Sequence, residues 1–178
     1  MNGPPPQRVL VIGSPGAGKS TLARQLGELL RLPVIHLDAH FWQPGWVHVP
    51  FDEWEETVER LTEGESWIMD GNYGTSLHLR IPAADTIIHL DFPRYICIWR
   101  VLKRLILHYG RTRPDLAPGC PEHLDLEFIK WVWDFQRKIR PYNLRMLDLF
   151  AQGKHVITLR HPKEIRKFLR TLAPGKGR

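Results

Sequence analysis

The chain lacks long apolar runs and has few cysteines. No hydrophobic stretch approaches the roughly 20 consecutive apolar residues of a membrane-spanning helix, so we expect no membrane partner. The two cysteines, Cys97 and Cys120, have no CxxC spacing and no neighbouring His/Cys cluster, which argues for free thiols and against a zinc site. Met1–Gln7 is rich in proline and has no apolar core of the kind that a signal peptide carries. These absences predict a cytoplasmic protein.

Acidic residues are outnumbered by basic ones. The 178 residues include 25 Lys and Arg against 19 Asp and Glu, which gives a formal net charge of +6. Basic residues spread over a surface would indicate nucleic acid, whereas arginines gathered at one pocket would indicate a polyphosphate ligand. The arginines concentrate in residues 94–113 and 137–145, which favours the polyphosphate. The basic run 160–178 leaves weak contact with nucleic acid open.

Short apolar runs alternate with helical patterns along the chain, and the length fits one domain, residues 1–178. The expected strands are residues 8–12, 34–37, 67–69, 86–90 and 155–159. The expected helices are residues 19–31, 51–61, 93 to about 108, 124–139, 142–151 and 163–172. This alternation predicts an α/β fold with a parallel sheet covered by helices on both faces. Ligands of such sheets bind at the carboxyl ends of the strands.

A phosphate-binding motif follows the first expected strand. Gly13, Gly18, Lys19 and Ser20 meet the spacing G-x-x-x-x-G-K-[ST]. The glycines allow the backbone to curl so that successive N–H groups face phosphate oxygens, and the following helix directs its positive N-terminus to the same point. The motif predicts ATP on Gly13, Ser14, Pro15, Gly16, Ala17, Gly18, Lys19, Ser20 and Thr21.

Two oxygen-bearing side chains are candidates for Mg²⁺. The Ser20 hydroxyl belongs to the phosphate motif, and Asp70 ends the strand expected beside it. Asp70 would hold Mg²⁺ through water or hold Ser20 in place. The competing interpretation of Asp70 is a strand-end residue that caps a turn.

Beyond this motif the sequence resembles nucleoside-monophosphate kinases such as adenylate kinase. Trp67–Gly71 resembles their strand that ends in Asp-Gly, and Asp91–Arg104 resembles their strand-to-helix segment, where Asp-x-Pro precedes two arginines four apart. The resemblance implies that Arg100 packs on the adenine and that Arg104 contacts phosphates.

A closer resemblance is to bacterial topology modulation, or FlaR-related, proteins, which are small adenylate-kinase-like ATPases. It rests on residues 36–46, 70–73 and 110–115. The resemblance to the kinase family implies a three-layer P-loop fold, five parallel strands in the order 2-3-1-4-5, and a helical and loop lid at about residues 109–140. The label of this group implies an effect on DNA.

The acceptor region, about residues 38–64, is less defined. Adenylate kinase follows its Asp-Gly with an apolar residue, Pro and the Arg that holds the acceptor phosphate, whereas this chain reads Asn72-Tyr73-Gly74, with Arg80 further along. Asp38 sits where small-molecule kinases of the P-loop class often carry an aspartate for an acceptor hydroxyl. It could orient or deprotonate that hydroxyl, or it could form a turn. The acceptor therefore stays open.

Other residues around these motifs have two interpretations each. Arg111 and Arg113 lie in a Gly/Pro-rich segment that is either a closing lid or an ordinary exposed loop. The resemblance also makes Arg137 and Arg140 candidates for phosphate contacts. Aromatic residues, namely Phe41, Trp42 and Trp46, could wall an acceptor pocket or belong to the core. His36 and His40 are expected to be polar pocket walls or surface residues.

Two functional hypotheses follow. In the first, the protein is a small kinase that transfers the γ-phosphoryl of ATP–Mg²⁺ to a small acceptor. Its predicted catalytic residues are Lys19, Asp38, Asp70, Arg104, Arg113 and Arg137. In the second, it is an ATP-responsive nucleic-acid-binding regulator, although no helix-turn-helix, zinc-finger or RNA-recognition motif is present in the sequence. The oligomeric state stays open.

Overall fold

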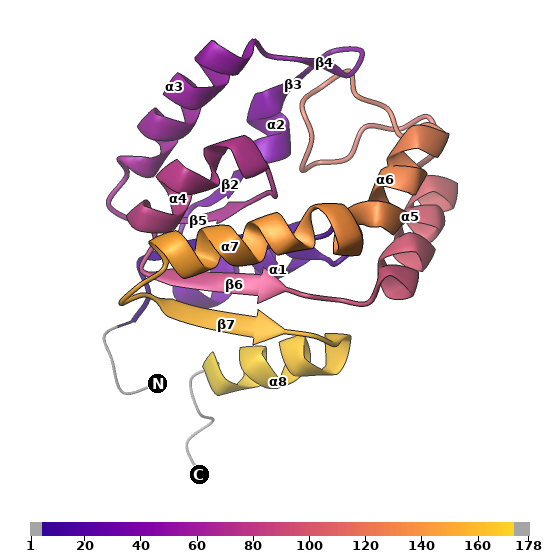
Figure 1. The fold of residues 1–178 in the computed structure, drawn as a ribbon. Helices are drawn as coiled ribbons and strands as arrows, with labels where there is room; N and C mark the ends of the chain where they lie inside the picture. The colour runs from indigo at the N-terminus through magenta and orange to yellow at the C-terminus, as the bar shows by residue number, and fades with distance from the viewer. Residues whose placement is uncertain (1–4, 173–178) are drawn as a thin grey trace.

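A parallel five-stranded sheet forms the centre of a computed structural model of the chain, which describes residues 5–172 (Figure 1). Its strands are β1 (Arg8–Gly13), β2 (Val34–His36), β5 (Trp67–Asp70), β6 (Thr86–Leu90) and β7 (His155–Leu159). Their order is β2-β5-β1-β6-β7, and every neighbouring pair is parallel. Numbered among themselves along the chain, the strands run 2-3-1-4-5. The predicted fold class and strand order are confirmed.

The sheet is joined by helices and one small hairpin. The helices are α1 (Lys19–Leu30), α2 (Leu37–Phe41), α3 (Phe51–Thr62), α4 (Leu77–Ala83), α5 (Arg94–His108), α6 (Leu126–Lys138), α7 (Arg140–Phe150) and α8 (Pro162–Leu172). The short elements are the hairpin strands β3 (Trp42–Gln43) and β4 (Val47–His48) and the 3₁₀ turn η1 (Gly74–Ser76). Within residues 5–172, no helix has the length and apolar character that crossing a bilayer requires.

The two faces of the sheet are covered by different helices because successive strand residues point to opposite sides. Val9 and Val11 of β1 belong to one core with buried residues of α1 and α5, against which α8 packs. Leu10 and Ile12 belong to the other core, with α3, α4 and α7. In Figure 1, α7 crosses in front of the sheet. Burial on both faces explains why these strands are continuous apolar runs.

The register of the strands brings polar residues together at the carboxyl edge of the sheet. Asp70 at the end of β5 is the Cα partner of Val11 on one side and of His36 on the other. Gly13 and Leu90 are paired where β1 and β6 end. The phosphate motif therefore begins beside Asp70.

The element boundaries differ from the predictions in several places. The predicted helix 142–151 is α7, Arg140–Phe150, because Pro141, which was expected to separate two helices, is tolerated in its first turn. Residues 74–83, which no prediction covered, form η1 and α4, because Leu77 and Ile81 bury themselves against the sheet despite the nearby Gly74 and Pro82. The predicted strand 34–37 ends at His36, since Leu37 begins α2. The predicted helix 124–139 begins at Leu126, because the Asp125 side chain caps it by accepting a hydrogen bond from Phe128 N.

Residues 109–125, which we call the lid loop, fold back toward α2 and the β3–β4 hairpin (Figure 1). Isolated bridges join Tyr109 with Glu122 and Thr112 with Pro121, so the two arms of the loop lie side by side. The tip turns inward, and its buried residues are Asp115, Leu116, Ala117 and Cys120. Of the predicted lid, about residues 109–140, the first half is this loop and most of the second half is α6.

Candidate active site

The phosphate motif forms a tight loop between β1 and α1 that only glycine permits at its closest points. Gly16 has φ 76°, and a Cβ built on it would lie 2.3 Å from Cys97 O on α5. Gly13 has φ 141°, and its Cβ would lie 2.4 Å from Leu90 O. Both values are far inside contact distance, so a side chain at either position would displace backbone. The loop therefore packs directly on α5 and β6.

Arg100 of α5 holds the outer side of this loop. Its guanidinium donates a 2.8 Å hydrogen bond to Ala17 O and approaches Gly16 O at 3.5 Å. With these carbonyls held outward, the loop N–H groups are free to face an anion. The predicted contact of Arg100 with adenine stays a prediction, and the structure adds a role in shaping the loop.

Lys19 lies at the start of α1, turned back over the loop. Its Nζ donates a 3.3 Å hydrogen bond to Ser14 O. Burial lowers the pKa of Lys19, while the negative charges of Asp38 and Asp70 oppose that shift. Lys19 thus lies in the field of both predicted site aspartates, which is the arrangement expected of a cation that bridges bound phosphates and an acceptor.

Asp70 is held rigidly beside the loop. It is 3% exposed, and His36 Nδ1 lies 2.8 Å from its Oδ1. This hydrogen bond raises the pKa of His36 against the effect of burial, so His36 is a stronger base than an ordinary histidine. His36 was expected to be only a pocket wall, and its position shows a closer relation to Asp70.

The oxygen donors present fit Mg²⁺. Ser20 and Asp70 offer a hydroxyl and a carboxylate, which are the hard ligands that Mg²⁺ prefers. In the described part of the chain, no three His, Cys, Asp or Glu side chains converge into a metal cage. A site of so few protein ligands suits Mg²⁺, which is commonly bound by one or two carboxylates together with nucleotide phosphates and water.

Asp38 lies on α2, at the start of the acceptor region. Tyr73 Oη donates a 2.6 Å hydrogen bond to Asp38 Oδ1. Burial raises the pKa of Asp38, whereas the Tyr73 hydrogen bond and the charge of Lys19 favour the carboxylate. Burial and the same carboxylate raise the pKa of Tyr73, so the phenol remains a donor. Asp38 is thus a half-buried carboxylate whose position is fixed by the Tyr73 hydrogen bond.

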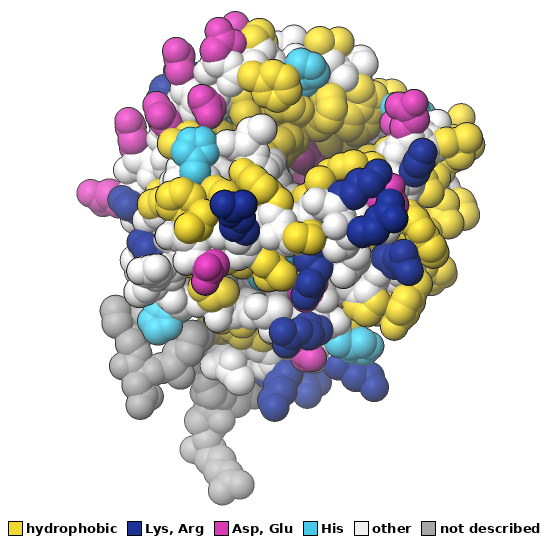
Figure 2. Space-filling view, in the orientation of Figure 1, with side chains coloured by type: hydrophobic (Ala, Val, Ile, Leu, Met, Phe, Trp, Pro, Cys, Tyr) yellow, Lys and Arg dark blue, Asp and Glu magenta, His cyan; other side chains and the backbone are white. Residues whose placement is uncertain are grey.

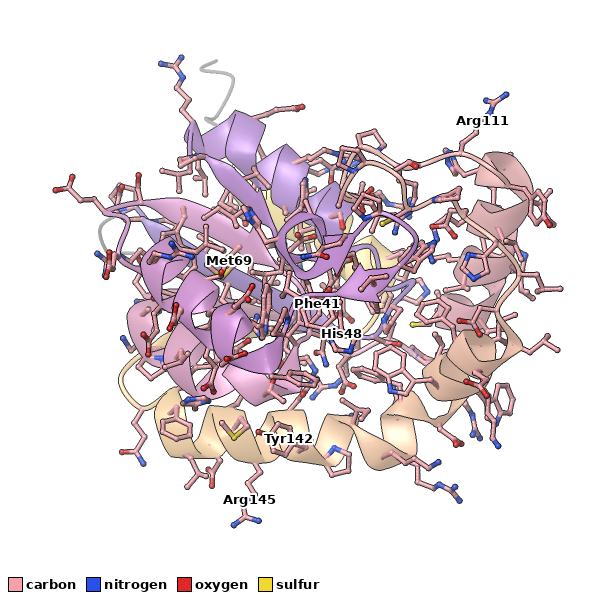
Figure 3. All side chains as sticks on the ribbon, turned by 90° about the horizontal axis from the view of Figure 1, so that it is seen from above. Phe41, His48, Met69, Arg111, Tyr142 and Arg145 are labelled. Atoms are coloured by element: carbon pink, nitrogen blue, oxygen red, sulfur yellow. The ribbon has the colours of Figure 1, made fainter. Side chains whose placement is uncertain are left out.

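Four aromatic residues beside Asp38, namely Phe41, Trp42, Trp54 and Tyr73, form what we call the aromatic wall. The ring centroid of Phe41 lies 4.5 Å from that of Tyr73 and 5.0 Å from those of Trp42 and Trp54. Figure 3 shows Phe41 beside His48 of the hairpin, and their rings are stacked at 5.9 Å. The sequence left open whether Phe41, Trp42 and Trp46 wall a pocket or fill the core. Phe41 is buried, and Trp42 and Trp46 are half-buried.

The loop after β5 is fixed by two residues that the sequence did not single out for this role. Asn72 Oδ1 accepts hydrogen bonds from Gly13 N at 3.2 Å and from Asn143 Nδ2 of α7 at 2.7 Å. Arg80 is fully buried, and its guanidinium donates to the carbonyl oxygens of Gly71, Tyr73 and Ser76. Burial lowers the pKa of Arg80 to about 9. Arg80 therefore braces the loop from behind and is not free to hold an acceptor phosphate.

The lid loop brings charges of both signs toward the phosphate motif. Arg113 donates to Glu122 Oε1 at 2.6 Å and to Asp115, and Arg104 Nε lies 3.1 Å from the same Glu122 oxygen. Burial raises the pKa of Asp115, but Arg113 and the nearby Ser20 hydroxyl outweigh that effect, so the pKa falls below its ordinary value. Two arginines and two carboxylates thus meet in front of Ser20.

The lid loop is docked on the β3–β4 hairpin. Gly45 N donates to Gly119 O at 2.8 Å, and Trp46 Nε1 donates to Pro121 O at 2.9 Å. The thiol of Cys120 is buried, with Sγ 3.1 Å from Gln43 O. The hairpin and the lid loop therefore close one side of the site together.

Not every predicted arginine reaches the site. Arg111 is exposed and points away from the molecule (Figure 3). The side chain of Arg137 is 78% exposed and lies 3.9 Å from Asp134 on its own helix. Arg140 is bound by Asp91 through two hydrogen bonds of 2.7 and 2.8 Å. The structure brings Lys19, Asp38, Asp70, Arg104 and Arg113 together, and it leaves Arg137 outside this group.

Sequence reasoning missed the site roles of Tyr73, Asn72, Asp115 and Glu122. Asn72 and Tyr73 follow the strand-end Asp70-Gly71, so their proximity to the carboxyl edge was a usable signal. Asp115 and Glu122 belong to a segment without periodicity, where the sequence does not say which side chains turn inward.

No protein-family model matches the chain, and neither does any curated protein sequence. Solved structures do match it over nearly its whole length. Shikimate kinase from Acinetobacter baumannii, in complex with shikimate, matches with a TM-score of 0.60 and 18% identity over 93% of this chain and 90% of that chain. A structure from Chloroflexus aurantiacus J-10-fl, provisionally described as a kinase, matches with a TM-score of 0.56 and 18% identity over 94% and 96%. The chain shares the fold of these proteins.

Proposed function

We propose that this protein is an ATP-dependent kinase that transfers the γ-phosphoryl group to a hydroxyl of a small acceptor. The observation that carries the proposal is the half-buried Lys19, which folds back over the phosphate motif with its Nζ 3.3 Å from Ser14 O and in the field of both Asp38 and Asp70. A phosphate-binding lysine, a strand-end aspartate for the metal and an acceptor-side aspartate are the parts that phosphoryl transfer requires. The kinase descriptions of two structural neighbours support the same reaction class.

In the proposed step, the acceptor oxygen attacks the γ-phosphorus and a new P–O bond forms. The bond between the γ-phosphorus and the β,γ-bridging oxygen breaks, and its electron pair leaves with ADP. The hydroxyl proton passes to the Asp38 carboxylate and then to solvent. The step needs no oxidant or reductant.

The remaining residues supply charge and position. Lys19, Arg104 and Arg113 neutralise the phosphates and the transferring phosphoryl group, while Arg100 shapes the loop and, by the resemblance to adenylate kinase, covers adenine. Mg²⁺, held by Ser20 and Asp70, would add charge neutralisation at the β- and γ-phosphates. The docked lid loop limits the access of water, which would otherwise compete with the acceptor. We expect such a protein in the cytoplasm.

The test is ADP release from ATP–Mg²⁺ with and without a panel of nucleosides, nucleoside monophosphates and other small hydroxylated metabolites. We expect one class of acceptor to accelerate ADP release and Lys19→Ala to lower that rate by about 100-fold or more. Lys103→Ala is the matched control, because Lys103 is exposed over Trp99 on the outside of α5. A slow rate that no acceptor changes would argue against the kinase.

The second candidate is a nucleic-acid-binding regulator, in line with the resemblance to topology modulation proteins. Its supporting observation is a group of exposed basic residues at α8, namely Arg160, Lys163, Arg166, Lys167 and Arg170. Figure 2 shows basic side chains gathered at the position of α8. Binding of duplex DNA by fluorescence anisotropy at two salt concentrations tests it, because phosphate contacts weaken steeply with salt. Loss of binding in Lys163→Gln/Lys167→Gln would support this candidate.

A further inference from the structure

Aromatic and other apolar side chains surround Asp38 on the side away from the phosphate motif. The aromatic wall stands beside the carboxylate, and the buried face of the lid loop, Leu116, Ala117 and Cys120, packs against Trp42 and Trp46. In Figure 2 a hollow opens between the hairpin side and α6, lined largely by hydrophobic side chains, with an acidic side chain at its floor. An occupant would meet apolar surface on its sides and a carboxylate at its end.

The cations near Asp38 are already engaged. Among the charges that act on its carboxylate, the cations with the largest effect are Lys19 and Arg113. Lys19 belongs to the phosphate motif, and Arg113 is bound by Asp115 and Glu122. The charges of Arg104 and Arg113 are matched by those of Asp115 and Glu122, so the group as a whole adds no net positive charge.

Arg80 is the first arginine after the Asp70-Gly71 strand end, so it is a candidate cation for the acceptor side. Its guanidinium, however, is hydrogen-bonded to backbone carbonyl oxygens. It is fully buried and donates to three backbone carbonyl oxygens behind the loop of Tyr73. His40, near the same region, is a weak cation, since burial lowers its pKa. In residues 5–172, no lysine or arginine hydrogen-bonds to the side chain of Asp38 or Tyr73.

Helix α3, which supplies one residue of the aromatic wall, carries mostly acidic side chains. Helix α3 supplies Trp54 to the wall, and its sequence FDEWEETVERLT contains Asp52, Glu53, Glu55, Glu56 and Glu59 against Arg60 as the one basic residue. Figure 2 shows acidic side chains gathered over α3. All five carboxylates are exposed, and Arg60 donates a hydrogen bond to Thr57 on its own helix.

A phosphate or carboxylate on the acceptor would therefore be placed beside apolar rings and the carboxylate of Asp38. Buried anions need a paired cation or several hydrogen-bond donors, and phosphate is usually bound by an arginine fork. The two cations with the largest effect on Asp38, Lys19 and Arg113, are ones that the ATP phosphates and the transferring phosphoryl already require.

We infer that the acceptor is a hydroxyl compound without an anionic group, with an apolar face that lies on Trp42 and Tyr73, the half-buried members of the aromatic wall, and a hydroxyl at Asp38. This inference rests on the proposed kinase function and specifies its substrate class. Nucleosides and neutral sugars or polyols belong to this class, whereas nucleoside monophosphates and hydroxy acids do not. The transfer is the one written above, from ATP to the acceptor oxygen, with the proton leaving through Asp38.

The test uses acceptor pairs that differ only in charge. Each nucleoside is compared with its 5′-monophosphate, glucose with glucuronate, and shikimate methyl ester with shikimate, and product formation is followed by mass spectrometry. We expect the uncharged member of the productive pair to have a kcat/KM about 100-fold higher or more, since a site cannot compensate a buried charge without a partner. Lys19→Ala abolishes the transfer, and Lys103→Ala leaves it intact.

A binding measurement accompanies the kinetics. The Asp38→Asn variant with a non-hydrolysable ATP analogue is titrated with both members of each pair, and the fluorescence of Trp42 and Trp46 reports occupancy. We expect quenching by the uncharged member alone, at concentrations about 100-fold below any effect of the anion.

The outcomes separate the two proposals. Lys19-dependent transfer to an anionic member, at a rate equal to or above that of its neutral partner, overturns the inference and leaves the kinase standing. Absence of Lys19-dependent transfer to every compound overturns the kinase itself, and the inference falls with it.

Discussion

The phenol of Tyr73 donates a 2.6 Å hydrogen bond to the carboxylate of Asp38. The bond joins the loop after β5 to α2, which are 35 residues apart in sequence. It holds Oδ1 and leaves the second oxygen of Asp38 for another partner. An acceptor hydroxyl bound there would meet a carboxylate whose orientation is already set.

The pH dependence of activity tests the role of Asp38. Because burial raises its pKa above the ordinary 3.8, we expect activity to fall, as the pH is lowered, at a higher pH than an ordinary aspartate would give. Asp38→Asn is expected to lower kcat by about 100-fold or more and to remove this acid limb. A raised pKa also means that ionised Asp38 destabilises the fold as the pH rises through that pKa, so the variant should be at least as stable at pH 7.

Tyr73→Phe tests the hydrogen bond itself. Tyr73 favours the ionised carboxylate, so its loss is expected to move the acid limb to higher pH, with only a few-fold change in kcat on the plateau. The phenylalanine keeps the aromatic wall in place. A pH profile identical to that of the unaltered protein would contradict the assignment.

Arg80→Met is expected to destabilise the fold. The carbonyl oxygens of Gly71, Tyr73 and Ser76 would lose their buried donor, at a cost of about 3 kcal/mol in the free energy of unfolding. Arg80→Lys should not restore it, because an ammonium lacks the planar fork. Urea unfolding provides the measurement. Arg145→Met is the control, since Arg145 points outward from α7 (Figure 3), and equal stability of the two methionine variants would refute the bracing role.

Gly16→Ala tests the contact of the phosphate motif with α5. Gly16 and Gly153 have nearly the same φ, 76° and 73°, but a Cβ at Gly153 would meet nothing within 4 Å. Both alanine variants carry the cost of positive φ, about 1 kcal/mol, and only Gly16→Ala adds the clash with Cys97 O. We expect loss of ATP binding and a larger fall in melting temperature for Gly16→Ala. Calorimetric titration and thermal unfolding decide it.

Arg104 and Arg137 should differ sharply in their effect on catalysis. Arg104 lies beside Glu122 and in the field of Lys19, so Arg104→Met is expected to lower kcat by about 100-fold or more. Arg137→Met should stay within about twofold, because its side chain is mostly in solvent. Steady-state kinetics with the best acceptor give the comparison. A strong effect of Arg137→Met would show that α6 moves toward the phosphates during turnover.

Glu122→Gln tests the docking of the lid loop. Glu122 is the shared partner of Arg104 and Arg113, and its neutralisation leaves these two cations side by side. We expect amide hydrogen exchange across residues 109–125 to become about tenfold faster. Glu127→Gln, on the exposed side of α6, should leave it unchanged. Equal exchange in both variants would mean that backbone and apolar contacts alone hold the loop.

Features that depend on the local spacing of residues, such as the phosphate motif and the strand ends, could be predicted from the sequence. The phosphate motif is a backbone structure that its glycines determine, so its position between β1 and α1 followed from the sequence. The strand order followed from the resemblance to adenylate kinase and from the rule that such sheets are parallel. The individual strand ends then placed Lys19 and Asp70 at the same edge.

Side-chain partners across loops could not be predicted in this way. Arg111 and Arg113 are two residues apart in a segment without periodicity, yet one points to solvent and the other binds Asp115 and Glu122. Arg80 lies six residues beyond the position where adenylate kinase carries its acceptor arginine, and the sequence does not say which way its side chain points. In the folded protein, the Arg80 side chain points to three backbone carbonyl oxygens behind the loop, which need a buried hydrogen-bond donor. This need arises only once the chain is folded.

Alkylation of the buried thiol of Cys120 would report how often the lid loop opens. The thiol lies against Gln43 O under the hairpin, so an alkylating agent reaches it only during the moments when hairpin and loop part. A group attached there would occupy the space that the hairpin needs, and the protein could not close again. An opening during which Cys120 is alkylated becomes permanent. The rate of irreversible inactivation by an electrophile would therefore measure how often the hairpin and the lid loop separate.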